Sequence, residues 1–208
     1  MFGKGYIENR KRGEAMEDIK NLILDKAKER MERFGFKKTT MDEISADCRI
    51  SKKTIYLHFR DKEDMFTCLI MREFHKMLDV IFARMGVVPD PRERLISLTR
   101  TAIQYFNEDN FTTRILKDDD ALFSVFLSRK FHSLIDEEII SLVAGIIREG
   151  KEQGQFHDVD EKVVAYAHYK LFQAFSYLRT ARSWEKPQEY YTEILLDLLE
   201  KTLVKKGD

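Results

Sequence analysis

Residues 40–59, TMDEISADCRISKKTIYLHF, decide the fold of this chain. Thr40 followed three positions later by Glu43 forms a capping box, in which each side chain accepts a hydrogen bond from the other residue's backbone, and it predicts the start of a short helix. After a break at residues 49–50, Ser51 can cap a second short helix. Two short helices joined by a tight break predict a helix-turn-helix, whose second helix enters the major groove of DNA.

Helical patterns continue on both sides of this stretch. Only 9 Gly and 3 Pro occur among 208 residues, so few positions break a helix. Apolar residues at helical spacing predict further helices over residues 17–34, 62–85, 91–106, 132–153, 160–182 and from 187 onward, with one more capped by the acidic run at 118–120. The predicted fold class is all-α, with an N-terminal three-helix helix-turn-helix domain and a larger C-terminal helical domain.

The charge divides at the same place as the fold. The whole chain holds 36 basic and 36 acidic residues, yet residues 1–62 hold 16 against 11 (net +5), and residues 63–208 hold 20 against 25 (net −5). We therefore expect a flexible basic arm over 1–14, a DNA-binding domain over 15–62, and a domain for effector binding and dimerisation over 63–208. The arm either enters a minor groove or is a disordered tail that adds nonspecific attraction.

Polar side chains in and beside the two short helices are the candidate DNA contacts. Those at the start of the second helix can reach base edges or flanking phosphates, and those further along it point toward the sugar-phosphate backbone. Amides at the start of the first helix, together with a hydroxyl, offer another phosphate site. The candidates are Thr40, Lys52, Lys53, Thr54, Tyr56 and His58.

The segments GFKKTTMDEISA (35–46) and ISKKTIYLHFRDKEDM (50–65) resemble the N-terminal domain of the TetR family of one-component transcriptional regulators, over roughly residues 15–66. The resemblance implies a repressor that a small molecule releases from a pseudo-palindromic DNA operator. It also implies roles for single residues. Phosphate contacts fall on Thr40, Tyr56, His58 and Lys62, and base-reading or groove-entry positions fall on Lys52, Lys53 and Thr54.

The turn between the two short helices departs from the family pattern. Cys48 and Arg49 stand where the family usually has Ala-Gly. If Arg49 adopts a positive φ angle, it carries about 1 kcal/mol of strain that Gly avoids. We expect either a slightly reshaped turn or a strained Arg, with DNA binding retained.

The last two helices are the candidate dimer interface. A single helix-turn-helix spans only a few base pairs, so a homodimer is expected. Two apolar stripes can form a four-helix interface with a second copy, as the final helices of the resembled family usually do. They consist of Val164, Ala167, Leu171, Ala174 and Leu178, and of Tyr191, Ile194, Leu195, Leu198 and Leu199. The alternative is that these stripes only complete the core of the monomer.

Aromatic residues beyond residue 100 suit an apolar pocket for a small hydrophobic effector, with an acyl-type molecule preferred. The candidates are Phe106, Phe111, Arg114, Phe123, Phe126, Tyr166, Tyr169, Phe172 and Gln173. For any single aromatic among them, an ordinary core position is the simpler expectation. His168, which has apolar neighbours, fits a core or interface histidine better than a ligand contact.

Several classes of protein are not expected. Two cysteines, Cys48 and Cys68, are too few for a disulfide framework, which favours a reducing compartment. The sequence shows neither an apolar stretch long enough to span a membrane nor a secretory signal. We therefore expect a cytoplasmic protein without membrane association. The histidines show no metal-ligand spacing, and Gly145 to Lys151 has phosphate-loop spacing without the Ser or Thr that should follow. We expect no metal, cofactor or enzyme activity. A helical protein-interaction module, an activator, and a regulator without an effector remain alternatives.

Overall fold

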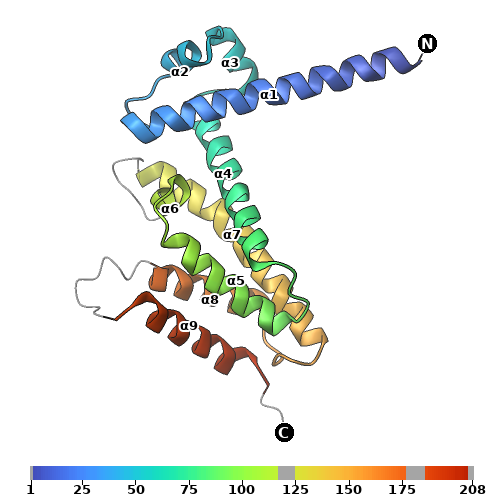
Figure 1. Ribbon diagram of the computed structural model, residues 1–208, viewed down its shortest axis with the longest axis vertical. Helices are drawn as coiled ribbons and strands as arrows, with labels where there is room; N and C mark the ends of the chain where they lie inside the picture. The colour runs from blue at the N-terminus through green and yellow to red at the C-terminus, as the bar shows by residue number, and fades with distance from the viewer. Residues whose placement is uncertain (1, 117–124, 177–185, 206–208) are drawn as a thin grey trace. The chain divides into compact units, whose positions relative to one another are not determined.

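A computed structural model describes residues 2–116, 125–176 and 186–205, with side chains described for 16–114, 135–175 and 186–205. These ranges are predominantly helical, which confirms the all-α prediction (Figure 1). The helices are α1 (Phe2–Phe34), α2 (Met41–Cys48), α3 (Lys52–His58), α4 (Lys62–Met85), α5 (Pro91–Phe106), α6 (Phe111–Leu116), α7 (Val125–Glu152), α8 (Glu161–Ser176) and α9 (Gln188–Leu203).

The N-terminal caps predicted at Thr40 and Ser51 are confirmed, and Asp61 and Asp90 cap the two helices that follow. Thr40, Ser51, Asp61 and Asp90 each accept a hydrogen bond from the backbone N–H three residues further on, at 3.3, 3.1, 2.7 and 2.9 Å. Gly35 follows α1 with φ 79°, the left-handed conformation that ends many helices. Local capping chemistry therefore sets where most of these helices begin.

The structure differs from the sequence prediction at three helices. Helix α1 begins at Phe2, so residues 2–14, expected to form a flexible arm, continue the helix; this segment contains no Pro to stop it. Helix α6 was not predicted, and α7 begins at Val125 rather than at 132. The acidic run at 118–120 lies outside the described residues.

The chain divides into two units. Unit 1 comprises residues 1–73 and 118–131, and unit 2 comprises residues 74–117 and 132–208. We expected a boundary near residue 62, but the continuous helix α4 contributes to both units. In unit 1, α2 packs against both α1 and α3. Its fully buried side chains include Ile23, Met31, Ile44, Ile55, Phe59 and Phe66.

In unit 2, helices α5, α8 and α9 pack against one another. This packing changes the expected dimer interface, because Tyr191, Leu195 and Leu199 are at most 7% exposed within the single chain and belong to its core. A terminal helix has to bury one apolar face in its own unit, and these residues form that face. The predicted residues with partly or fully exposed side chains are Val164, Ala167, Leu171, Ala174, Ile194 and Leu198. Leu178 lies outside the described residues.

Candidate nucleic-acid interface

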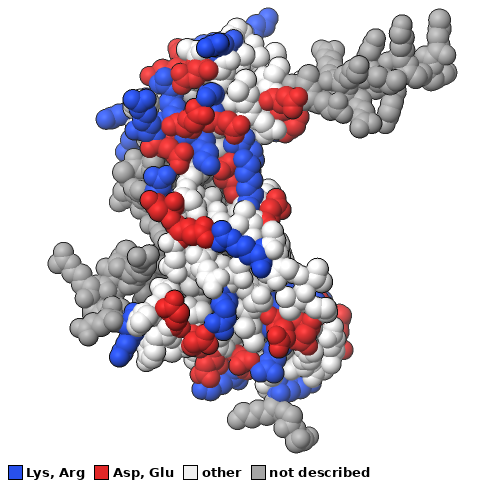
Figure 2. Space-filling view, viewed as in Figure 1, with Lys and Arg blue, Asp and Glu red and all other residues white. Residues whose placement is uncertain are grey.

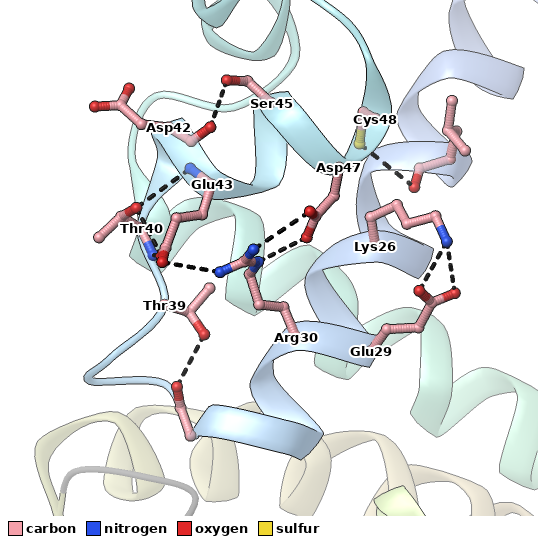
Figure 3. Close-up of polar contacts among 12 residues, drawn as sticks. Lys26, Glu29, Arg30, Thr39, Thr40, Asp42, Glu43, Ser45, Asp47 and Cys48 are labelled. Atoms are coloured by element: carbon pink, nitrogen blue, oxygen red, sulfur yellow. Dashed lines mark hydrogen bonds and ion pairs between the residues drawn. The ribbon is translucent and has the colours of Figure 1, made fainter.

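Helix α2 is braced against α1 by a single arginine. Arg30 Nε donates to Asp47 Oδ2 at 2.6 Å, and its guanidinium also lies 2.9 Å from Glu43 Oε1 (Figure 3). Hydrogen bonds from Thr40, together with Arg30, hold the pKa of Glu43 below its usual value. The capping box and the inter-helix ion pairs thus share the Glu43 carboxylate, which ties the start of α2 to α1.

The turn between α2 and α3 is made by a strained arginine. Arg49 has φ 54° and ψ 39°, which is the left-handed region, and its N–H bonds to Ala46 O at 3.0 Å. Ile50 N–H continues the turn by bonding to Ser45 O at 3.1 Å. Of the two outcomes expected from the sequence, the structure shows the strained Arg, and the turn keeps the geometry for which Gly is usually required.

Replacing Arg49 by Gly is therefore expected to raise the free energy of unfolding by about 1 kcal/mol, because Gly adopts positive φ without a Cβ clash. Urea unfolding followed by circular dichroism measures this change. Ala46→Gly, at an exposed position inside α2, is the matched control and should lower stability by about 1 kcal/mol. A loss of stability in Arg49→Gly would show that the guanidinium makes a compensating contact.

Helix α3 has one buried face and one exposed face. Ile55 and Phe59 are 0% and 1% exposed and anchor the helix in unit 1. Tyr56 and Leu57, on the outer side, are 47% and 71% exposed. Leu57 is not among the residues predicted from the sequence. It lies two positions after the buried Ile55, and this spacing on a helix could have indicated that its side chain is exposed. The exposed face suits the surface of a recognition helix.

The structure gives several of the predicted contact residues a partner within the protein. Lys52 Nζ lies 2.6 Å from Asp42 Oδ1, and Thr54 Oγ1 lies 2.8 Å from Ser51 Oγ. The Thr40 hydroxyl belongs to the capping box. DNA would have to share or replace these interactions. Lys53, by contrast, is exposed and has no hydrogen bond or ion pair to any described residue.

Lys62 has a different place from the one that the family resemblance implies. Its Nζ donates to the backbone oxygens of Phe36 and Thr39, both at 2.9 Å, and lies 4.3 Å from the centre of the Phe36 ring. Burial lowers its pKa from the usual value for lysine. These contacts hold the loop that leads into α2. The bonds of Lys62 therefore support a positioning role, and direct phosphate contact stays a prediction.

The surface of unit 1 is not uniformly basic. Figure 2 shows Lys and Arg side chains alternating with Asp and Glu side chains on the visible face of this unit. The exposed cations in and near the two short helices are Lys37, Lys38, Arg49, Lys52, Lys53 and Arg60, of which Arg60 pairs with Asp64. The net charge of +5 over residues 1–62 therefore does not make this unit's visible face entirely basic.

Unit 2 contains an apolar cavity of about 60 Å³ between α4, α5, α7 and α8. Three of the predicted effector-binding residues, Phe106, Tyr169 and Phe172, line it. Four others, namely Phe111, Arg114, Tyr166 and Gln173, are not among its lining residues, and the side chains of Phe123 and Phe126 lie outside the described part of the chain. Sequence reasoning missed the wall formed by Met77, Leu98, Thr99 and Val143. His168, predicted as a core or interface histidine, is 5% exposed and also lines the cavity.

Among the described side chains, no group of three His, Cys, Asp or Glu residues is placed to hold a metal ion. Within the described ranges, no helix has the length and hydropathy needed to cross a bilayer.

Together, the capped helix pair, the tight turn and the outward face of α3 define a helix-turn-helix DNA-binding protein. Residues 23–68 match the family model described as bacterial regulatory proteins, tetR family. The chain is 24% identical over 189 residues to an uncharacterized HTH-type transcriptional regulator, YhgD, from Bacillus subtilis strain 168, covering 90% of this chain and 96% of that protein. Residues 23–68 are thus similar to the DNA-binding domain of the tetR family, and the chain is a transcriptional regulator.

Two solved structures share the fold. A putative transcriptional regulator from Saccharomonospora viridis, in complex with choline, has a TM-score of 0.64 and 20% identity, covering 91% of this chain and 100% of that one. FadR from Bacillus subtilis, in complex with stearoyl-CoA, has a TM-score of 0.63 and 17% identity, covering 86% and 96%. At these identities the likeness concerns the fold.

Proposed function

We propose that this regulator is a homodimeric repressor that binds a pseudo-palindromic operator and is released from it by a small hydrophobic effector. The single observation that carries the DNA-binding part is the α2–turn–α3 unit, in which Ile55 and Phe59 hold the exposed face of α3 in a fixed orientation. The bracing of α2 by Arg30 keeps this unit rigid. A rigid recognition helix reduces the entropy lost on binding.

Dimerisation through α8 and α9 is part of the proposal. Leu171 on α8 and Leu198 on α9 are 42% and 41% exposed in the single chain, and a second copy would cover them. Ala167 and Ala174, both exposed and one helical turn from Leu171 on either side, allow close approach of a second helix. A two-fold dimer would place two copies of α3 on successive half-sites.

Effector binding is assigned to the cavity in unit 2. Its lining contains no Asp, Glu, Lys or Arg, so it favours an uncharged apolar molecule. The related regulators with choline and with stearoyl-CoA support the idea that members of this fold respond to small molecules. By binding one conformation of the dimer better than another, the effector would change the spacing of the two recognition helices and lower DNA affinity.

The test is selection of binding sites from random double-stranded DNA, followed by affinity measurements with single variants. We expect an enriched two-fold symmetric sequence. Lys53→Ala should change which bases are preferred at one position of each half-site, with a discrimination loss of about 1–3 kcal/mol, because base contacts specify sequence.

Tyr56→Phe is the variant to compare with Lys53→Ala, because it tests a phosphate contact instead of a base contact. It removes one hydroxyl from the outer side of α3 and should weaken binding to all sites alike if the hydroxyl meets phosphate. Equal weakening of every site by Lys53→Ala would show that Lys53 is not a base reader. If selection enriches no sequence, the chain is better explained as a helical protein-interaction module.

A further inference from the structure

The cavity in unit 2 contains a histidine that its otherwise apolar lining does not explain. His168 is 5% exposed and lies on α8, and beside it Thr99 comes from α5. The other lining residues are hydrocarbon or aromatic side chains, apart from the hydroxyl of Tyr169, which accepts a hydrogen bond from Gln173 Nε2 at 2.9 Å. The chemistry of His168 therefore dominates what this cavity can recognise.

The hydrogen bonds of Thr99 fix where the imidazole proton lies. Thr99 Oγ1 is 2.8 Å from Leu95 O and 3.1 Å from His168 Nε2. A carbonyl oxygen only accepts, so the single hydroxyl proton must lie between Oγ1 and Leu95 O. The remaining contact then requires His168 Nε2–H to donate to Thr99 Oγ1. This assignment puts the ring proton on Nε2.

The opposite nitrogen is consequently a hydrogen-bond acceptor. Burial lowers the pKa of His168 to about 4, so the ring is neutral near pH 7 and Nδ1 carries a lone pair. Nδ1 is buried and has no hydrogen-bond partner among the described residues. Buried polar atoms in native proteins nearly always have a partner, and a buried acceptor is costly to leave without one.

We propose that His168 Nδ1 is the polar anchor of the effector, and that the effector is an uncharged, largely apolar molecule with a hydroxyl or amide N–H that donates to this nitrogen. Thr99 acts as a positioning residue, because it holds the tautomer in which Nδ1 accepts. This inference rests on the effector-binding part of the proposed function and narrows it from hydrophobic ligands in general to those with a donor.

The size and charge of the cavity limit the effector further. A cavity of about 60 Å³ is smaller than the roughly 150 Å³ cavity that takes up benzene, so an effector of that size or larger must displace side chains of the lining. A carboxylate or phosphate would lose its hydration without gaining a cation, since the lining contains no Lys or Arg. The anchor thus selects against anionic head groups at this point.

The experiment compares two isomers that differ only in the donor. Binding of n-butanol and of methyl propyl ether to the full-length protein, without DNA, is followed by NMR with isotope-labelled histidine. We expect n-butanol to bind about tenfold more tightly than the ether. In the NMR spectra, Nε2 of His168 should be protonated, and the nitrogen resonance of Nδ1 should shift toward lower frequency as the alcohol is added. Butanoate should bind more weakly than n-butanol.

Two substitutions at the positioning residue are matched controls. Thr99→Val keeps the shape of the side chain but removes the acceptor for Nε2–H, so the preference for the alcohol should fall to about twofold or less. Thr99→Ser keeps the hydroxyl and should keep the preference. His168→Leu should remove the preference for the alcohol altogether. If this variant does not fold, Thr99→Val and Thr99→Ser still test the proposal.

Equal affinity of the two isomers, no detectable binding of the alcohol, or a proton on Nδ1 would overturn the proposal. An unchanged preference in Thr99→Val would overturn the role of Thr99. Because the assay contains no DNA, its outcome is separate from the test of operator binding. A protein that selects no operator could still prefer the alcohol, and a protein that selects an operator could show no such preference.

Discussion

Raising the salt concentration from 50 to 200 mM is expected to weaken operator binding by about 10³–10⁵-fold, because each phosphate contact releases condensed counterions from the DNA. Six exposed cations, at positions 37, 38, 49, 52, 53 and 60, lie in and near the candidate interface in each copy of the chain. If three to five of them meet phosphate in each subunit, a dimer makes roughly 6–10 contacts, and the logarithm of the affinity falls with the logarithm of salt with a slope of about −5 to −9.

The internal ion pairs of unit 1 refine this expectation. Lys52 already pairs with Asp42 at 2.6 Å, so its charge is partly compensated before DNA arrives. It should therefore contribute less to the slope than Lys38, which is exposed and has no hydrogen bond or ion pair to any described residue. Fluorescence anisotropy with the selected operator at several salt concentrations measures this. Lys38→Gln should make the slope shallower by about one unit per subunit, whereas Lys52→Gln should change it less. A slope near zero for the unmodified protein would contradict DNA binding through this surface.

The helix-turn-helix was largely predictable from sequence because its determinants are local. Thr40 and Glu43 lie three positions apart, and the hydrogen bonds that begin α2 join these same residues. Ser51 caps α3 in the same way. Positive φ at Arg49 was foreseen as one outcome, since the αL conformation is a property of a single residue in a short turn. Short-range chemistry of this kind can be inferred from spacing.

The contacts of Lys62 and the effector cavity were not predictable on the same basis. Lys62 bonds to carbonyl oxygens 26 and 23 positions earlier in the chain, and no sequence pattern shows which of two polar partners, a loop or a phosphate, a lysine will choose. The cavity is built from four helices, and Thr99 meets His168 across 69 positions. Aromatic content indicated a pocket in general, but the packing of α5 against α8 determined which side chains line it.

Replacing Gly150 by Ala is expected to lower the free energy of unfolding of unit 2 by about 1–3 kcal/mol, the usual cost of overpacking a core. A Cβ at this position in α7 would overlap the ring of Phe156, which is 1% exposed. The ring cannot withdraw easily. The N–H groups of Gln155 and Phe156 both bond to Gly150 O, at 2.9 and 3.2 Å, and His157 N–H bonds to Leu203 O at 2.8 Å.

Gly145→Ala in the same helix is the control for backbone effects. A Cβ at Gly145 meets nothing within 4 Å, so this change should stabilise the protein by about 0.5–1 kcal/mol through helix propensity alone. The two variants share the same chemical change, and the difference between their urea midpoints isolates the clash with Phe156. Similar midpoints for both would mean that the Phe156 ring can move. A large difference would show that Gly150, which has phosphate-loop spacing from Gly145 in the sequence, is required for close packing at the end of α7.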